Sequence, residues 1–380
     1  MTIPAAPRTI DRLAALVKGD PIPWTAFAAT PADFLSQCDE HEVAALVYER
    51  VRALPETCGW PAHVVDLLGT EARRRAAREL IEERELKAVV AALAANGLTV
   101  LLMKGSALAY SLYAAPWLRP RIDTDLLMRR DDVDRVRAAM AELGYRAGVF
   151  CEGDLLFGQF PLQRTGGFGI VYRFDCHWRI STQPLFADAV TFDEAVTRSR
   201  AVPALGAGAR ALGVVDALIV ACIHPAMHHR NAESLLWLYD IHLLAAALAE
   251  HEFVQFAGIA ADKRVAAVCA HQLRLARARF GTPLPDAAMT VLSAAESRGE
   301  PSAEYLEPNR AWIDELASSI GGLPRWSDRL RLLREVVFPA PAYMLKAAGL
   351  TGSHLGVALL PMLYLRRLAS GGWKVLAGQK

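Results

Sequence analysis

Residues 119–130, RPRIDTDLLMRR, carry two aspartates inside an apolar run that favours a β-strand. Alternate side chains of a strand share one face, so Asp123 and Asp125 are predicted to project together. Two negative charges on one face of a sheet repel each other, and buried carboxylates need a counter-charge. Two interpretations follow. Both side chains hold a divalent cation such as Mg²⁺, or each is paired with one of the nearby arginines, Arg119, Arg121 or Arg129.

The charge of the chain is nearly balanced, which excludes a protein that attracts its partner through a strong global field. The 380 residues contain 42 Lys and Arg against 41 Asp and Glu, for a formal net charge of +1. RNA binding would therefore need a local basic patch, and the charge as a whole does not indicate it.

Cysteine usage and the amino-terminal segment favour a cytoplasmic location. Six cysteines are scattered without a C-x-x-C pair, which argues against a disulfide framework and against a thiolate zinc site. The first twenty residues, MTIPAAPRTIDRLAALVKGD, do not resemble a secretory signal. The most apolar segment falls short of the roughly 20 residues that a membrane-spanning helix needs, so no transmembrane segment is predicted.

The spacing of apolar residues predicts an α+β fold that is mostly helical. Helical periodicity runs from Asp11 to about Ala95, and Gly97 supplies a stop. Three short runs then favour strands, at residues 98–104, 121–128 and 168–180. We expect helices to flank a small mixed β-sheet in three regions: an N-terminal helical region (1–95), an α/β core (96–205), and a C-terminal helical domain (206–380) with a loop around 281–308.

The third predicted strand supplies another carboxylate. Arg173, Asp175 and His177 alternate on one face of this strand, opposite a clean apolar face. If the strand pairs beside the one that carries Asp123, Asp175 completes a site of three carboxylates. The alternative is that Asp175 forms a salt bridge with Arg173 or Arg179.

The junction between the first strand and the helix after it is suited to a phosphate group. In residues 103–110, MKGSALAY, Gly105 and Ser106 stand where the strand becomes a helix. A glycine lets the backbone approach a phosphate closely, the first N–H groups of a helix attract negative charge, and Lys104 adds a cation. Such turns are common, but this one is followed about twenty residues later by the D-x-D strand.

Residues 101–128, LLMKGSALAYSLYAAPWLRPRIDTDLLM, resemble the Gly-Ser and Asp-x-Asp motif of the DNA polymerase β-like nucleotidyltransferase superfamily. The chain is similar in particular to a bacterial group of uncharacterised nucleotidyltransferases, from about Ala44 to about Arg367. One departure is the sixteen residues between Ser106 and Asp123, a longer spacing than usual. The residues that match the group are Lys104, Gly105, Tyr113, Arg119, Pro120, Asp123, Asp125, Leu143 to Tyr145, Asp175, His177, Trp178, His224, His228, Trp237 and Asp240.

This resemblance implies a Mg²⁺-dependent enzyme, with Mn²⁺ as the alternative ion, that moves an NMP group from an NTP to a hydroxyl or phosphate acceptor. The acceptor would be a small molecule, a peptide or protein, or a tRNA end. Asp123, Asp125 and Asp175 would be the catalytic residues and metal ligands, and Asp175 would also orient or deprotonate the acceptor hydroxyl. The implied nucleotide-binding residues are Lys104, Gly105, Ser106, Arg119, His177, His224 and His228. A non-catalytic nucleotide-binding or partner-binding module on the same fold is the alternative.

Several polar residues in apolar surroundings have more than one interpretation. His224 and His228 share a face of a predicted helix, which suits zinc, but Pro225 follows the first and no third ligand is evident. We expect the two histidines to line the cleft between the lobes. His177 would touch substrate or assist proton transfer, or else be structural. Asp240, within an apolar helix, is predicted to pair with a buried Arg or His.

Two further segments also leave alternatives open. The arginines at 73–75 and 78 form a basic cluster, interpreted as a solvated helix face or as an RNA-contacting patch. Residues 356–365, GVALLPMLYL, are predicted to form a core helix. An interfacial membrane helix is the alternative, because two arginines follow the apolar run.

Overall fold

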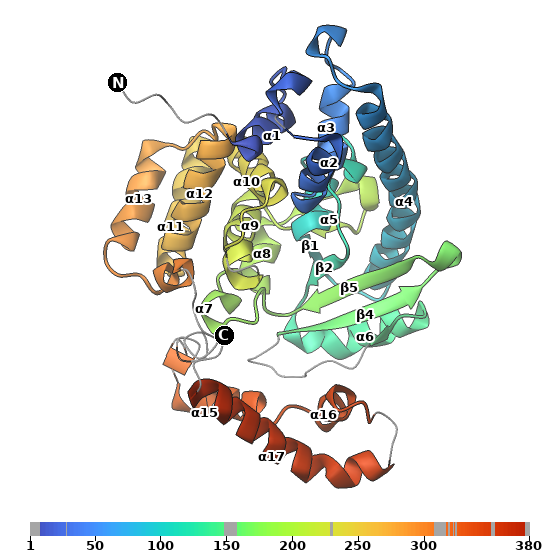
Figure 1. The fold of residues 1–380 in the computed structure, drawn as a ribbon. Coiled ribbons are helices and arrows are strands. Elements are labelled where there is room, and N and C mark those ends of the chain that lie inside the picture. The colour runs from blue at the N-terminus through green and yellow to red at the C-terminus, as the bar shows by residue number, and fades with distance from the viewer. Residues whose placement is uncertain are drawn as a thin grey trace.

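The computed structural model describes residues 8–376, apart from residues 28, 148–157, 229–230, 308–316, 318–319, 322, 324 and 351–353. Within these residues, one mixed sheet of seven short strands lies among a much larger number of helices (Figure 1). The predicted α+β, mostly helical fold is therefore confirmed.

Helices occupy the chain before the first strand, as the sequence predicts. They are α1 (Thr9–Lys18), α2 (Pro31–Glu40), α3 (Ala44–Val51) and the 34-residue α4 (Ala62–Ala95). Gly97 follows α4 with a φ of 65°, a left-handed value that favours glycine, so the predicted stop is confirmed.

The sheet has the strand order β3-β4-β5-β2-β1-β7-β6. The strands are β1 Leu101–Met103, β2 Thr124–Leu127, β3 Arg146–Ala147, β4 Gln159–Thr165, β5 Val171–His177, β6 Arg200–Ala201 and β7 Arg210–Ala211. β2 is parallel to β5 and β1 is parallel to β7, whereas the other neighbours are antiparallel. The predicted pairing of the strand at Asp125 with the strand at Asp175 is confirmed, because these two residues lie opposite each other.

The strands differ from the sequence prediction in length and number. Each predicted strand is shorter than expected: β1 begins at Leu101, β5 begins at Val171, and β2 begins at Thr124, so Asp123 lies just before the strand. Four further strands, β3, β4, β6 and β7, are not predicted from the sequence. β3, β6 and β7 have two residues each, too few for alternation to be visible. β4 contains Pro161, which argues against a strand in the interior of a sheet.

One face of the sheet is covered by α4 and by α6, which follows β2. Leu93 of α4 and Met140 of α6 are buried in one cluster with Leu126 and Phe174 of the sheet. Because α4 lies along this face, it contributes side chains near the ends of both β2 and β5. The helices between the strands are α5 (Lys104–Ala109), α6 (Val133–Glu142), α7 (Pro184–Ala187) and α8 (Phe192–Arg198).

The helices after the sheet share a second core with the N-terminal helices. They are α9 (Val214–His228), α10 (Leu235–Ala247), α11 (Glu250–Asp262), α12 (Ala266–Phe280) and α13 (Asp286–Glu296). Leu13 and Leu46 from the N-terminal helices are buried in one cluster with Leu218, Leu244 and Leu273. The prediction of a loop around residues 281–308 is wrong, because α13 and a 3₁₀ helix at Pro301–Leu306 occupy most of that segment. The division into three regions at 95 and 205 stays a prediction.

The last helices correct the interpretation of residues 356–365. They are α15 (Trp326–Val337), α16 (Pro341–Ala347) and α17 (His354–Leu376). The predicted core helix lies in α17, but Val357, Met362 and Leu365 are 56%, 57% and 65% exposed. The prediction of a core position is therefore wrong. Among the described helices, none combines the length and apolarity needed to cross a membrane.

A buried ion pair fixes the segment that leads into β2. The Arg121 guanidinium donates to both carboxylate oxygens of Glu79 in α4, each at 2.7 Å, and the two side chains are 6% and 8% exposed. The Tyr110 hydroxyl donates to the same carboxylate. This contact holds α4 against the residues that position Asp123.

Removing one partner of this pair is expected to destabilise the protein strongly. Glu79→Ala leaves the Arg121 charge buried without a counter-charge, and we expect a loss of about 3 to 5 kcal/mol in the free energy of unfolding. Urea denaturation measures it. The control is Glu83→Ala on the same helix, which breaks the more exposed pair with Lys87 and should cost at most about 1 kcal/mol. Equal losses for the two variants would contradict a structural role for the Glu79 pair.

Candidate active site

Two carboxylates and an imidazole converge where β2 and β5 run side by side. Asp125 and Asp175 are opposite each other in the parallel pair, and His177 follows Asp175 on the same face of β5. One ligand atom from each of these three residues lies within 4.8 Å of the other two. The predicted proximity of Asp125 and Asp175 is confirmed. The third member of this close group is His177 rather than Asp123.

The Asp125 carboxylate is the centre of a small polar network. Its Oδ1 accepts a hydrogen bond from Lys104 Nζ at 2.8 Å and lies 2.9 Å from His177 Nε2. Burial alone would raise the pKa of Asp125, but the Lys104 ammonium and the His177 hydrogen bond outweigh it and hold this pKa well below its usual range. Asp125 is therefore ionised at neutral pH.

Asp123 lies beside this network without joining it. Its side chain lines the same pocket as Asp125 and Asp175. Burial, followed by repulsion from Asp125 and Asp175, raises the pKa of Asp123 to about 6, although Lys104 and Arg119 act in the opposite direction. Burial and Asp125 also raise the pKa of Asp175, against the effect of His177. The three carboxylates thus have too little positive charge around them, which is the setting in which a bound cation is favourable.

The arginines near these aspartates in the sequence have other partners. Arg121 binds Glu79, Arg129 Nη2 lies 2.7 Å from Asp193, and Arg179 Nη2 lies 2.6 Å from Asp188. Arg119 donates to Asp240 from Nε at 3.0 Å and from Nη2 at 2.8 Å, which confirms the buried partner predicted for Asp240. Among the described residues, no ion pair joins an arginine to Asp123, Asp125 or Asp175. The interpretation that arginines neutralise these aspartates is therefore wrong, and the cation paired with Asp125 is Lys104.

A pocket of about 400 Å³ opens above the carboxylates. This volume is within the range of about 300 to 1,000 Å³ that small-molecule sites occupy. It brings together the turn between α2 and α3, the start of α5, the segment before β2, the strands β2, β4 and β5, and the helices α9 and α10. Its lining residues are Glu42, Lys104, Gly105, Arg119, Pro120, Arg121, Ile122, Asp123, Asp125, Gln159, Asp175, His224 and Trp237.

Comparison with known protein families gives a match. The profile of a family described as uncharacterised nucleotidyltransferases matches residues 28–281, about two thirds of the chain. No curated protein and no solved structure matches this chain.

The chain belongs to this nucleotidyltransferase family. The resemblance to a nucleotidyltransferase family is thus confirmed, but the match ends at residue 281 rather than at about Arg367. The matched residues include all those that line the pocket. α15, α16 and α17 lie beyond the part of the chain that the family profile matches.

The nucleotide-binding residues implied by the nucleotidyltransferase resemblance are distributed unequally around the pocket. Lys104, Gly105, Arg119 and His224 line it. Ser106 is buried, and its Oγ donates to Thr124 Oγ1 at 3.1 Å. His177 is buried behind Asp125 and does not line the pocket. The side chain of His228 lies outside the described residues, as does His229.

Gly105 has a packing reason to be a glycine in this family member. A Cβ at this position would lie 3.3 Å from Arg119 Nη1, close enough that this guanidinium would have to move by a few tenths of an ångström, and 3.4 Å from Arg121 Cβ, an ordinary contact. The preceding residue, Lys104, has a φ of 51°, an uncommon left-handed value for a residue with a side chain. Close packing and local strain at this turn therefore aim the Lys104 ammonium at Asp125.

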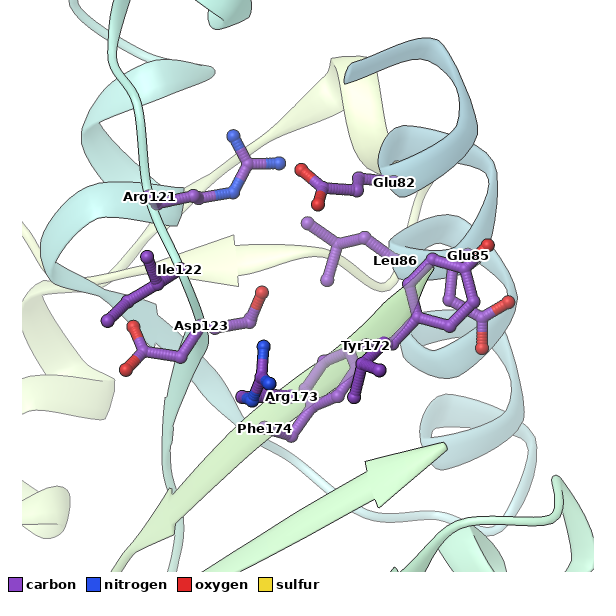
Figure 2. Close-up of a pocket in the computed structure, with 11 residues that line it drawn as sticks. Glu82, Glu85, Leu86, Arg121, Ile122, Asp123, Tyr172, Arg173 and Phe174 are labelled. Carbon is purple, nitrogen blue, oxygen red and sulfur yellow. The ribbon is translucent and has the colours of Figure 1, made fainter. Parts of the chain in front are cut away.

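Two smaller hollows adjoin the main pocket along α4. Figure 2 shows the first, which is lined by Glu82, Glu85 and Leu86 of α4, by Arg121, Ile122 and Asp123 in the segment before β2, and by Tyr172, Arg173 and Phe174 of β5. The second, of about 220 Å³, is lined by Arg74, Arg75 and Arg78 with Trp117, and shares the wall from Arg119 to Ile122 with the main pocket.

The basic cluster on α4 is paired within its own helix. Arg74 and Arg75 both bind Glu71, at 2.8 and 2.7 Å, and Arg78 lies 2.7 Å from Glu82. These contacts agree with a solvated helix face. The cluster nevertheless borders the second hollow beside the site.

Two pocket residues were not given a role by sequence reasoning. Trp237 was noted as part of the family pattern, and its ring lies edge-on to His224 with centroids 5.3 Å apart. Glu42 is more than fifty residues before the strand region, in a segment that no motif singles out. The N-terminal helices share one buried cluster with α9 and α10, and this tertiary packing brings Glu42 to the pocket.

The raised pKa of Asp123 predicts an unusual stability profile for the metal-free protein. A carboxyl whose pKa rises from 3.8 to about 6 on folding binds its proton more tightly in the folded state, so stability falls as the pH rises from about 4 to about 6. Asp123→Asn removes this loss. We expect the variant to be more stable than the natural protein by about 1 to 2 kcal/mol at pH 7 and nearly equal to it at pH 4.

Urea denaturation in the presence of a chelator, at both pH values, measures this difference. Asp131→Asn, which removes an exposed carboxylate close in the sequence, is the control and should change little at either pH. A destabilised Asp123→Asn variant at pH 7 would contradict the electrostatic account of the site.

Proposed function

We propose that this protein is a divalent-metal-dependent nucleotidyltransferase that moves an NMP group from an NTP to a hydroxyl or phosphate acceptor. Membership of the family supports transfer of a nucleotidyl group in general. The observation that carries the proposal is the convergence of Asp125 and Asp175 from parallel neighbouring strands at the floor of the main pocket. A cytoplasmic location remains a prediction.

The donor atoms of the site suit a divalent cation. Asp125 and Asp175 offer carboxylate oxygens, Asp123 borders them, and His177 adds an imidazole nitrogen within reach. Oxygen ligands suit Mg²⁺, and an imidazole beside them also suits Mn²⁺. When bound, such an ion neutralises the negative charge that builds up on the α-phosphate and on the departing pyrophosphate.

Asp175 is proposed to orient the acceptor and to take its proton. A bond forms between the acceptor oxygen and the α-phosphorus, the bond from the α-phosphorus to the bridging oxygen breaks, and pyrophosphate leaves. A hydroxyl acceptor gives up one proton in this reaction. Burial, together with Asp125, raises the pKa of Asp175, which makes its carboxylate a stronger base than an ordinary aspartate.

Lys104 is proposed to change partner when the substrate binds. In the structure its ammonium neutralises Asp125. A triphosphate in the pocket offers a stronger anionic partner on the same side, and Lys104 lines that pocket. The second hollow along α4 is proposed to receive part of the acceptor, since it shares the wall from Arg119 to Ile122 with the main pocket.

Isothermal calorimetry with ATP, GTP, CTP and UTP, with and without Mg²⁺, tests the binding half of the proposal. We expect metal-dependent binding of at least one NTP that Asp125→Ala abolishes and the control Asp131→Ala preserves. Metal-independent binding that Asp125→Ala leaves unchanged would favour the alternative, a nucleotide-binding module without turnover.

Transfer of label from α-labelled NTPs to a cell extract tests the catalytic half. At NTP and Mg²⁺ concentrations that saturate the variant, Asp175→Asn should lose at least about a hundredfold of the transfer rate, because general base catalysis contributes on that scale. Transfer at an unchanged rate would show that Asp175 does not take the proton.

Lys104→Gln is expected to have opposite effects on two affinities. Without the ammonium on Asp125, the cation site is more negative, so Mn²⁺ alone should bind at least about tenfold more tightly. The Mn²⁺–NTP complex should bind more weakly, because the phosphates lose a cationic partner. Mn²⁺ electron paramagnetic resonance and calorimetry measure the two. If both affinities rise or both fall, Lys104 does not move from Asp125 to the phosphates when the NTP binds.

A further inference from the structure

Exposed apolar side chains are concentrated at the carboxyl-terminal end of the described chain. Eight of the thirteen large hydrophobic residues that are well exposed in the described part of the chain lie between residues 326 and 368, a span of 43 residues. These eight are Trp326, Leu330, Leu333, Phe338, Val357, Met362, Leu365 and Leu368. A concentration of this kind marks an interaction surface, whereas single exposed hydrophobic residues do not.

α17 turns an apolar stripe away from the protein. At about 100° per residue, the exposed positions 357, 358, 361, 362, 365, 368 and 369 cover an arc of about 140°, and all of them are apolar. Arg366 lies at the border of this arc. A helix that packs on a core buries such a stripe. Here the inner side packs on α15 and the segment after it: Tyr364 Oη donates to the Pro339 carbonyl at 2.6 Å, and Arg367 Nη2 donates to the Val336 carbonyl at 3.2 Å.

α15 repeats this arrangement. Trp326, Leu330 and Leu333 are spaced by four and three residues, so they share one face, and all three are exposed. Arg331 and Arg334 are exposed beside that face. α15 and α17 thus form a two-helix unit, with α16 between them in the sequence, and Figure 1 shows the three helices below the body of the molecule.

The unit also differs from the rest of the chain in charge. Residues 325–368 contain seven Lys and Arg against two Asp and Glu, a net charge of +5, whereas the whole chain has a net charge of +1. The remaining residues therefore carry a net charge of −4. The positive field is local to the surface that exposes the apolar side chains.

We propose that α15, α16 and α17 form a docking surface for a membrane with anionic lipids. Basic side chains beside an exposed stripe of Leu, Met and Trp are what an interfacial helix presents to lipid: the apolar side enters the acyl boundary and each cation near the surface is attracted by the negative headgroups. The absence of a membrane-spanning helix among the described residues agrees with a protein that lies on the bilayer rather than across it.

A second copy of the chain is a poorer occupant of this surface. A symmetric dimer through this face would bring two surfaces of net charge +5 together, and that repulsion opposes association. An anionic bilayer instead complements the charge and covers the apolar stripe at the same time. The proposal is independent of the catalytic function proposed above, because it involves none of the residues that line the pocket.

Vesicle flotation with the full-length protein tests the proposal. We expect the protein to float with phosphatidylcholine vesicles that contain phosphatidylglycerol, to float poorly with phosphatidylcholine alone, and to dissociate as salt is raised. Leu365→Glu should lower the apparent vesicle affinity at least about tenfold. The matched control is Leu80→Glu, which places the same charge at a leucine of α4 that is 70% exposed, and it should leave flotation unchanged.

Three results would overturn the proposal. The first is no flotation with either kind of vesicle, and the second is equal loss of flotation in the Leu365 and Leu80 variants. The third is a dimer, seen by light scattering, that Leu365→Glu converts to a monomer while vesicles do not bind, which would assign the surface to self-association. Both leucines are exposed, so circular dichroism should show that both variants remain folded.

Discussion

The parallel pairing of β2 with β5 is the constraint on which the site depends. It sets Asp125 directly against Asp175 and places His177 one step further along the same face. A shift of one residue in this register would turn either carboxylate to the opposite, apolar face of the sheet. The buried cluster behind the strands, which includes Leu126, Phe174 and Cys176, therefore fixes the register that the polar face requires.

Holding three carboxylates together costs free energy that the surrounding residues only partly offset. Lys104 and His177 stabilise the ionised form of Asp125, while the pKa of Asp123 and that of Asp175 stay raised. The arginines that would offset the charge are bound to carboxylates elsewhere, where they brace the segment from Arg119 to Arg129 against α4, α8 and α10. These residues surround a site that remains short of positive charge, which is the arrangement expected where a cation or a cationic complex is to be bound.

The sequence predicted the parts of this arrangement that depend on local pattern. Alternation in β5 and the D-x-D spacing were enough to expect Asp125 beside Asp175, and the apolar surroundings of Asp240 were enough to expect its buried arginine. The sequence could not predict that His177 contacts Asp125 or that Glu42 lines the pocket. Both depend on tertiary packing between segments far apart in the chain. It also misassigned Gly356–Leu365 to the core, because apolar periodicity shows that a helix has an apolar face and not which way that face points.

The central proposal is that Asp125 and Asp175 together would hold a divalent cation, which would neutralise charge on a bound triphosphate. Anomalous diffraction at the manganese absorption edge, from crystals grown with Mn²⁺ and a non-hydrolysable NTP analogue, tests it most directly. The account predicts an anomalous peak between the two carboxylates, with the Lys104 ammonium moved from Asp125 to a phosphate oxygen. Nucleotide bound away from β2 and β5, with no peak at the carboxylates and Lys104 still on Asp125, would contradict it.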